Sequence, residues 1–407
     1  MSSLIRHDRI RTLAEGDRPR RGPALGQLGV IEQGDVLVRG GRVAKVAPAL
    51  EAPPDTQIIE AGGRVLMPAF VDCHTHACWA GDRLAEWEMK LQGVPYVKIL
   101  EAGGGIHATV RAVREATRKQ LAANLRARLE VMLREGTTTV EVKSGYGLRR
   151  EDELNMLHAI QRAARGWPGT VQPTALLGHA FEGELADYVR MVLRDMLPAV
   201  AKDFPGIPVD AFCERGAWTV GACVKLFGRA RKHHPLRVHA DQFNSFGMVA
   251  EAVRLGARSV DHLEASTDGD LALLAQSPTF GVILPITGFH TDGRYARARR
   301  LVDAGGLLAL ATNCNPGTAP SSSMPLAIAL AVRACGLTPS EAIAATTVNA
   351  SSLLGFTDRG TIAVGQRADL ILLRHKDERL LAYELGGNPV DAVICGGKRV
   401  TDAEVQR

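Results

Sequence analysis

The chain has 407 residues, of which 46% are hydrophobic and 23% charged, and it carries a formal net charge of +5 at pH 7. This length is enough to bury one large core and a smaller second one. Basic residues are scattered among acids and no apolar run reaches membrane-spanning length, so we expect neither a nucleic-acid surface nor a membrane anchor. The charged start lacks the apolar core of a secretory leader, and seven cysteines without a CxxC pair are typical of a reduced, cytoplasmic protein.

The first predicted elements are short β-strands separated by glycines, as in residues 34–46. The same pattern returns near the end of the chain, at residues 368–373 and 392–400. Glycine turns between short apolar runs are typical of β-structure. We therefore predict that residues 1–65 and 356–407 pair into one small, discontinuous β-sandwich domain.

Between these ends, residues 66–355 alternate short apolar runs with longer helical stretches, which favours repeated β/α units around a parallel sheet. Several runs are continuously apolar and contain β-branched residues, as expected of strands that are buried on both faces. Eight parallel strands with interleaved helices form a (β/α)8, TIM-like barrel. The predicted strands lie near residues 67–74, 137–143, 171–177, 208–214, 236–240, 257–262, 280–285 and 307–313.

An open, doubly wound sheet is the alternative architecture. It would normally contain fewer strands and a glycine fingerprint directly after the first one. The nearest glycines, at residues 103–105, lie in a loop whose context is wrong for a dinucleotide. The sequence therefore favours an α/β protein with a barrel and a second, β-rich domain.

The first barrel strand reads FVDCHTHA over residues 70–77. Residues two apart in a strand point to the same side, so His74 and His76 present two imidazoles side by side. At the C-terminal mouth of a barrel strand, such a pair is a natural start for a metal site. An HxH pair alone is a moderate signal, because many such pairs bind no metal.

Three later strands also end in polar side chains. His239 ends the fifth predicted strand, His262 the sixth and Asn313 the eighth. A single histidine at a strand end is more often a packed or surface residue. Histidines at the same end of strands one, five and six instead indicate a functional site, because barrel active sites form at that mouth.

This order of an HxH pair, two further histidines and a polar group on strand eight resembles the amidohydrolase superfamily. Within it, the sequence is similar to the imidazolonepropionase family, and the matching motifs span most of the barrel. KSGYG and NPG are far more specific than HxH. The motifs are DCHTH at 72–76, AGDR at 80–83, AGGGI at 102–106, VEVKSGYGL at 140–148, HADQ at 239–242, DH at 261–262 and NPGT at 315–318.

The resemblance implies hydrolysis of the cyclic amide of 4-imidazolone-5-propanoate to N-formimino-L-glutamate, a step of histidine degradation. It also implies one divalent metal, Zn2+ or Fe. A ring amide is a poor electrophile, so the ion would polarise the carbonyl and acidify a water molecule. His262 would orient that water or stabilise the oxyanion, and Gln242 can both donate to and accept from the ring. The implied ligands are His74, His76, His239 and Asn313.

The resemblance further implies that loop residues bind this carboxylate-bearing small molecule. Arg83 offers a bidentate guanidinium after strand one, although an exposed arginine is more often a solubilising residue. Tyr146 follows strand two in a glycine-flanked loop, where the alternative is a loop anchor. The residues after strand eight could hold the product or form only a turn. The predicted binding set is Arg83, Tyr146, His179, Gln242, Asn315, Gly317 and Thr318.

Asn313 is the largest departure from the family pattern, which has an aspartate that binds the metal and carries the proton from water to the leaving nitrogen. An asparagine can offer its carbonyl oxygen to a metal but cannot act as a base. Three explanations stay open: an engineered change that traps a complex, a natural variant with another base, or a protein that binds without turnover. Glu214 and Asp241 are candidate replacement bases.

A second departure lies at His179, before which the family has an extra residue and after which it has a proline. Segment 284–292 is also unusual and could change the pocket wall. Two other functions therefore stay open: another amidohydrolase, such as a deaminase or cyclic-imide hydrolase, and a non-catalytic ligand-binding variant. Related barrels often dimerise, so a homodimer is expected by analogy alone.

Overall fold

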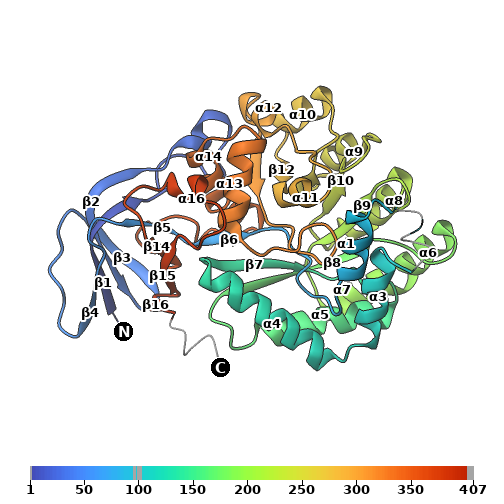
Figure 1. Cartoon of the computed structure of the whole chain (residues 1–407), viewed down its shortest axis with the longest axis horizontal. Helices are drawn as coiled ribbons and strands as arrows, with labels where there is room; N and C mark the ends of the chain where they lie inside the picture. The colour runs from blue at the N-terminus through green and yellow to red at the C-terminus, as the bar shows by residue number, and fades with distance from the viewer. Residues whose placement is uncertain (1, 95–97, 99–102, 401–407) are drawn as a thin grey trace.

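The computed structural model describes residues 2–94, 98 and 103–400. Within these residues the chain forms two eight-stranded sheets, one from the middle of the chain and one from its two ends (Figure 1). The middle sheet is a nearly closed barrel of parallel strands, with helices on its outside. The predicted α/β architecture, with a TIM-like barrel and a separate β-region from both ends, is confirmed.

The barrel strands follow one another in chain order, so each strand pairs with the next one in the sequence. The second strand has its predicted range of 137–143. The first predicted range, 67–74, combined two elements, because β5 (Val65–Pro68) belongs to the terminal sheet and only β6 starts the barrel. Both segments are buried and apolar, which hid this boundary. The barrel strands are β6 (Phe70–Asp72), β7 (Thr137–Lys143), β8 (Thr170–Gly178), β9 (Val209–Cys213), β10 (Arg237–Ala240), β11 (Ser259–His262), β12 (Phe280–Ile283) and β13 (Leu307–Leu310).

Several helices begin at residues that cap them. Thr117 caps α4 through a capping box with Gln120, and Thr338 does the same for α14 with Glu341. Hydroxyls at these positions satisfy backbone N–H groups that have no partner in the first helical turn. The described helices are α1 (Leu84–Leu91), α3 (Ile106–Glu115), α4 (Arg118–Arg134), α5 (Arg150–Ala164), α6 (Leu185–Met191), α7 (Leu197–Asp203), α8 (Val220–Ala230), α9 (Met248–Leu255), α10 (Asp268–Ala275), α11 (Pro285–His290), α12 (Ala298–Asp303), α13 (Met324–Ala334), α14 (Pro339–Ala345), α15 (Val348–Leu353) and α16 (Leu380–Tyr383), with a 3-10 turn η1 (Gly22–Gly26) and a π-helical turn η2 (Val192–Met196).

The terminal sheet curls around its own apolar core, to which Ile5 and Leu370 contribute from opposite ends of the chain. Its β5 strand pairs with β1 on one side and with β14 on the other, which joins the N-terminal and C-terminal strands. We propose that the two ends of the chain form one domain and the barrel the other; the predicted division into residues 1–65 with 356–407 and residues 66–355 falls inside β5, so the first boundary lies between β5 and β6. The remaining strands of this sheet are β1 (Ser2–Arg11), β2 (Val30–Arg39), β3 (Arg42–Ala47), β4 (Thr56–Glu60), β14 (Leu370–Leu373), β15 (Val390–Cys395) and β16 (Lys398–Arg399).

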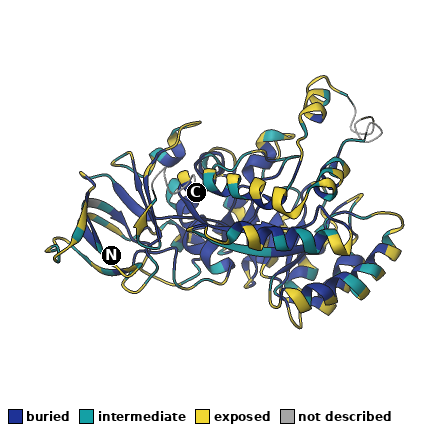
Figure 2. Cartoon of the chain, turned by 90° about the horizontal axis from the view of Figure 1, so that it is seen from below, coloured by how far each residue is buried: buried dark blue, intermediate teal, exposed yellow. Residues whose placement is uncertain are grey.

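Burial follows this arrangement. The barrel strands are buried inside the molecule, whereas the surrounding helices expose their outward faces (Figure 2). Among the described residues, no helix combines the length and the apolar character that are needed to cross a membrane.

The barrel closes where the chain beyond β6 meets the chain beyond β13. The backbone N–H of Asn313 donates to the carbonyl oxygen of His74 (3.0 Å), and the N–H of His76 donates to the carbonyl oxygen of Cys314 (3.0 Å). These two bonds join the two edges of the barrel sheet beyond the ends of the regular strands. They place two predicted histidines and the predicted asparagine at one rim of the barrel.

A buried carboxylate strengthens the same junction. Asp72 accepts hydrogen bonds from the backbone N–H (3.2 Å) and the hydroxyl (2.5 Å) of Thr312. Burial raises the pKa of Asp72 to about 7, although the two bonds from Thr312 oppose the shift. The hydroxyl of Thr312 is therefore an important partner for a carboxylate that water does not reach.

We expect Thr312→Val to lower the free energy of unfolding by about 1–3 kcal/mol, because it removes one donor from a buried carboxylate. Urea unfolding followed by circular dichroism measures this difference. Thr357→Val, at an exposed threonine, is the matched control and should change little. Equal effects of the two substitutions would contradict the role given to the Asp72 contact.

Candidate functional site

Three histidines converge at the C-terminal mouth of the barrel. His74 and His76 follow β6, and His239 lies on β10, across the barrel in strand order. One ligand nitrogen from each lies within 4.8 Å of the others, and the Nε2 atoms of His76 and His239 are 3.1 Å apart. All three side chains are buried. A group of three imidazoles with this spacing can hold a metal ion.

Two carboxylates fix how two of these rings face the centre. Nδ1 of His74 donates to Asp261 (2.6 Å), and Nδ1 of His239 donates to Asp210 (3.1 Å). Because an ionised carboxylate only accepts, each neutral ring carries its proton on Nδ1 and its lone pair on Nε2. Nε2 of His74 is buried and has no hydrogen-bond partner among the described residues.

Burial keeps these rings in the neutral form. It is the largest cause that lowers the pKa of His74 and of His76 well below the ordinary value. It also lowers the pKa of His239, although Asp210 opposes the shift. The neutral imidazole is the form that binds a metal ion.

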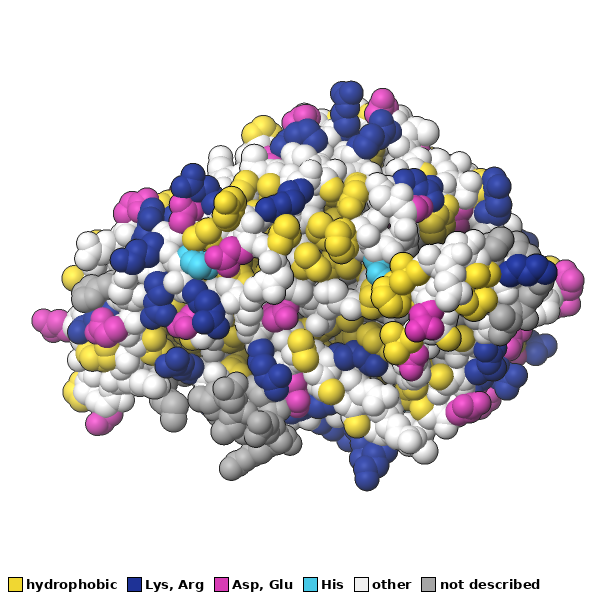
Figure 3. Space-filling view, in the orientation of Figure 1, with side chains coloured by type: hydrophobic (Ala, Val, Ile, Leu, Met, Phe, Trp, Pro, Cys, Tyr) yellow, Lys and Arg dark blue, Asp and Glu magenta, His cyan; other side chains and the backbone are white. Residues whose placement is uncertain are grey.

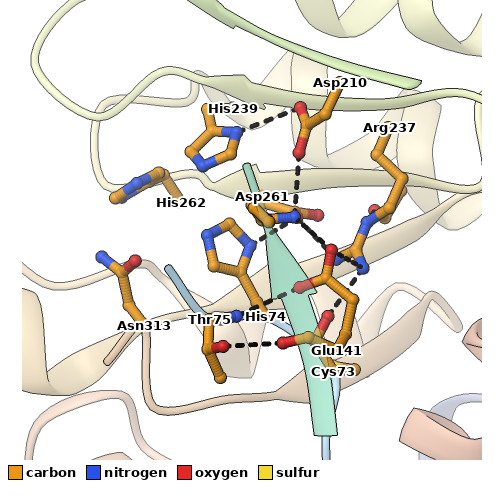
Figure 4. Close-up of polar contacts among 12 residues, drawn as sticks. Cys73, His74, Thr75, Glu141, Asp210, Arg237, His239, Asp261, His262 and Asn313 are labelled. Atoms are coloured by element: carbon orange, nitrogen blue, oxygen red, sulfur yellow. Dashed lines mark hydrogen bonds and ion pairs between the residues drawn. The ribbon is translucent and has the colours of Figure 1, made fainter. Parts of the chain in front are cut away.

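A layer of buried charges, which the sequence did not predict, lies next to the histidines (Figure 4). Lys143 donates to Glu141 (2.8 Å) and to Asp210 (2.9 Å), and Arg237 donates to Asp261 (2.7 Å). All five side chains are buried. The three carboxylates exceed the two cations by one negative charge.

The residues present fit a divalent cation. The histidines beside the charged layer are neutral, so its excess negative charge has no nearby counterpart among them. Nε2 of His74 and Oδ1 of Asn313 are both buried without a hydrogen-bond partner among the described residues. Unpaired buried acceptors are costly, and a cation bound between them would satisfy them and balance the charge.

Asn313 lies at the same mouth, on the same side of His74 as His262 in Figure 4. Its Nδ2 donates to the hydroxyl of Thr287 on α11 (2.8 Å), which leaves Oδ1 as the unpaired atom. Its backbone has a φ of 56°, in the left-handed region that asparagine tolerates better than most residues. The amide oxygen can therefore serve as a ligand, but it cannot take up a proton.

His262 contacts the histidine group from β11. Its ring centroid lies 5.7 Å from that of His239 and 6.1 Å from that of His74. Its Nδ1 lies 3.3 Å from Oε1 of Glu264, whose side chain is buried. Glu264 was not among the predicted site residues, although an acid two residues after a strand-end histidine is a usable signal in the sequence.

Gln242 and Glu264 line the same small crevice as Thr287. The two acids that the sequence suggested as replacement bases have other partners. Glu214 accepts from two backbone N–H groups of the loop after β10 (2.8 and 3.2 Å), and Asp241 accepts from a serine hydroxyl (2.8 Å). These contacts shape the loops around the crevice.

Tyr146 and His179 form a second wall beside the histidines. The His179 ring stacks on that of His76, with centroids 5.0 Å apart, and lies 5.1 Å from the Tyr146 ring. Nδ1 of His179 donates to the carbonyl oxygen of Gly145 (2.9 Å), and burial lowers the pKa of His179 to about 3. Gly145 has a φ of 109°, and a Cβ there would lie 2.9 Å from the side chain of Leu176, so this turn requires glycine.

Arg83 is held along one edge of its guanidinium. Nε donates to Glu86 (2.5 Å), and Nη2 forms an ion pair with the same carboxylate. Nη1 lies against Gly317, where a Cβ would come within 2.9 Å of it. Two predicted binding residues that are far apart in the sequence therefore meet at one place.

The side chain of Asn315 organises the loop after β13. Its Oδ1 accepts from the backbone N–H groups of Gly317 (2.9 Å) and Thr318 (2.8 Å), and its Nδ2 donates to the carbonyl oxygen of Asn313 (2.6 Å). Both the oxygen and the nitrogen of the Asn315 amide thus form hydrogen bonds within the turn. Binding of a ligand by Asn315, Gly317 or Thr318 stays a prediction.

Comparisons with known proteins agree with this architecture. A model of the amidohydrolase family matches residues 155–400. The imidazolonepropionase of Deinococcus radiodurans is 44% identical over 383 residues, which cover 94% of this chain and 96% of the relative. The imidazolonepropionases of Herpetosiphon aurantiacus (44% identity, 94% and 93% coverage) and Geobacillus kaustophilus (38%, 93% and 92%) match to a similar extent.

Solved structures share the fold at low sequence identity. A triazine hydrolase from Arthrobacter aurescens superposes with a TM-score of 0.73 at 16% identity, over 99% of this chain and 95% of its own. A mutant of an atrazine chlorohydrolase from the same species, complexed with zinc and atraton, gives a TM-score of 0.69 at 16% identity, over 98% and 95%. An amidohydrolase from a Sargasso Sea sample gives 0.68 at 18%, over 99% and 94%.

We expect Zn2+ to raise the unfolding temperature of metal-stripped protein. A ligand that binds only the folded state adds about 2.7 kcal/mol of stability when its free concentration is about 100 times its dissociation constant. Scanning calorimetry measures the shift, which His239→Asn should largely abolish. His233→Asn, at an exposed histidine, should retain it. A full shift in the His239 variant would show that the ion binds elsewhere.

Proposed function

We propose, for a chain that belongs to the amidohydrolase family and within it to the imidazolonepropionases, that its substrate is 4-imidazolone-5-propanoate. The chain is a hydrolase, as this membership establishes. The product of opening the cyclic amide would be N-formimino-L-glutamate, in histidine degradation. The observation that carries the proposal is the buried three-histidine group, which is suited to a metal; an arginine held by Glu86 beside Gly317, which is suited to a carboxylate, adds to it.

One divalent ion, Zn2+ or Fe, would be held by Nε2 of the histidines and by Oδ1 of Asn313. When bound, it would polarise the ring carbonyl and lower the pKa of a water molecule. Support comes from the unpaired Nε2 of His74 and Oδ1 of Asn313, and from the excess negative charge beside them. The fold neighbour that was solved with zinc is consistent with this choice of metal. The ligand set is His74, His76, His239 and Asn313.

Proton transfer falls to His262, because Asn313 cannot ionise. With Nδ1 donating to Glu264, Nε2 of His262 can take the proton of the attacking water and give it to the leaving ring nitrogen. A C–O bond forms and the ring C–N bond breaks, so the proton moves from oxygen to nitrogen without another reactant. The Gln242 amide can donate to the ring carbonyl oxygen or accept from the ring N–H.

The propanoate carboxylate would bind at Arg83. Glu86 holds Nε and Nη2 of the guanidinium, and Nη1 lies beside Gly317, where it donates to no group among the described residues and could donate to a carboxylate. Tyr146 and His179 would flank the ring and fix its orientation. Burial raises the pKa of the Tyr146 hydroxyl, so it is a neutral donor at physiological pH.

Ligand binding without turnover is a second candidate function, which the contact between Asn313 and Thr287 favours. The hydrogen bond from Asn313 to Thr287 holds a non-basic group where the family has its catalytic aspartate. A protein with this arrangement could bind the ligand without turnover. A related amidohydrolase activity on another heterocycle, such as deamination or cyclic-imide hydrolysis, is the other alternative to the specific substrate.

We also propose a cytoplasmic location and a homodimer, both by analogy with the family. The proposed partner is a small molecule that carries a carboxylate. Lys, Arg, Asp and Glu side chains are intermixed on the face shown in Figure 3, which gives that face no extended basic stripe for a nucleic acid.

We expect Asn313→Asp to raise kcat on imidazolonepropanoate by roughly 100-fold or more, because a positioned general base contributes about 10²–10⁴-fold. Loss of the imidazolone absorbance measures turnover, and elemental analysis confirms equal metal content. Asn388→Asp, at an exposed asparagine, controls for the added charge.

The outcomes of this assay separate the candidate functions. A metal-loaded Asn313→Asp protein that leaves imidazolonepropanoate untouched would rule out the proposed substrate. Tight binding by the unaltered chain, with turnover only in the variant, would instead establish the ligand-binding function.

We expect Arg83→Met to raise KM for the same substrate by roughly 10- to 100-fold with a smaller change in kcat, because a hydrogen bond to a charged group contributes about 1.5–3 kcal/mol. Steady-state kinetics measure both constants. Arg254→Met, at an arginine on the outside of α9, should leave them unchanged. An unaltered KM in the Arg83 variant would argue against a carboxylate-bearing substrate.

A further inference from the structure

A continuous chain of buried groups links two of the candidate metal ligands through the barrel interior (Figure 4). Acids and bases alternate along it, and its members come from the four barrel strands β7, β9, β10 and β11 and from the segment after β6. All of its side chains are buried. In order, the chain runs His239, Asp210, Lys143, Glu141, Arg237, Asp261 and His74.

One half of the chain starts at β10. Asp210 accepts from Nδ1 of His239 (3.1 Å) through one oxygen and from Nζ of Lys143 (2.9 Å) through the other. Lys143 also donates to Oε1 of Glu141 (2.8 Å). Burial opposes ionisation of Asp210, but His239 and Lys143 outweigh it and hold the pKa of Asp210 well below its usual value.

The other half ends at His74. Nη1 of Arg237 lies 3.6 Å from Oε1 of Glu141, and Nη2 donates to Asp261 (2.7 Å). Asp261 accepts from Nδ1 of His74 (2.6 Å). Nη1 of Arg237 also donates to the carbonyl oxygen of Cys73 (2.6 Å), next to His74 in the sequence.

Glu141 is the joint between the two halves. Among the described residues, it is the acid that ion-pairs with both Lys143 and Arg237. Its other oxygen accepts from the backbone N–H of Thr75 (3.1 Å), and its carbonyl oxygen accepts from the Thr75 hydroxyl (2.7 Å). Thr75 lies between His74 and His76, so the same residue also fixes the backbone of the HxH pair.

We propose that Glu141 is a positioning residue for the metal centre, which holds His74, His76 and His239 in one rigid geometry through the charge chain and through Thr75. The inference rests on the metal site of the proposed function and not on its substrate. Ionised groups in this position are costly without partners, and each link of the chain supplies one. Loss of Glu141 would leave Lys143 paired with Asp210 alone and Arg237 with Asp261, and would thereby loosen both carboxylates that orient the histidines.

The test is the Zn2+ affinity of Glu141→Gln, measured by competition with a chromophoric chelator. We expect roughly 10- to 100-fold weaker binding, as for other residues that orient metal ligands. The visible spectrum of the Co2+-loaded protein should change, because the ligand geometry changes. Glu341→Gln is the matched control, since Glu341 is a buried acid paired with Arg299 outside the site, and it should keep the affinity of the unaltered chain.

A second variant separates the effect of ligand positioning on Zn2+ affinity from the effect of the net charge of the buried layer. Glu141→Gln removes one negative charge, whereas Glu141→Gln combined with Lys143→Met restores the net charge of the layer and leaves the chain broken. We expect the double variant to bind Zn2+ as weakly as the single one. Recovery of the original affinity would overturn the positioning role, because charge alone would then explain the loss.

The double variant also covers a failure of the single one to fold, since removing a buried ion pair as a unit is often tolerated. Unaltered affinity in either folded variant overturns the inference. An unaltered chain that binds no divalent metal overturns both this inference and the metal site. A chain that binds Zn2+ tightly but does not hydrolyse imidazolonepropanoate removes only the proposed substrate.

Discussion

Ionised side chains that are enclosed by a barrel must be paired inside it, and this constraint determines how the side chains at the C-terminal mouth of the barrel are arranged. Water cannot reach Glu141, Asp210 or Asp261, so each needs a cation or a hydrogen-bond donor from a neighbouring strand. Lys143 and Arg237 balance two of these three negative charges, and the histidines are neutral. The remaining negative charge is one that the proposed divalent cation would balance.

Side chains two residues apart in a strand point to the same side, so single strands contribute two neighbouring groups to the buried network. Glu141 and Lys143 are two apart on β7, as are Arg237 and His239 on β10, so each pair points into the barrel. Asp261 and His262 are adjacent, and a regular strand would send them to opposite sides. His262 has a φ of 94°, which bends the chain as β11 ends and lets both neighbours face the same centre.

The sequence predicted the eight barrel strands and the histidines that end three of them, because these are local signals. It could not show that Glu141 and Lys143 lie inside, since alternating charges in a strand also describe a surface strand. Asp210 and Arg237 become partners of the site only when the barrel curves them together. The Arg83–Glu86 pair was similarly hidden, because an i, i+3 ion pair is common on exposed helices. The boundary between β5 and β6 was lost for the opposite reason: nothing polar interrupts it.

The closure between the chain beyond β6 and the chain beyond β13 has a consequence for assembly. Asp72 and Thr312, which join there, are 240 residues apart in the sequence. His74 and Asn313 sit at the same junction, so an ion shared by them would act as a cross-link around a very long loop, with the entropic benefit of a disulfide in such a position. A growing polypeptide would lack the last ligand until its eighth barrel strand had docked. Capture of the proposed metal would then be the final step of folding, and it would link the first strand of the barrel to the last.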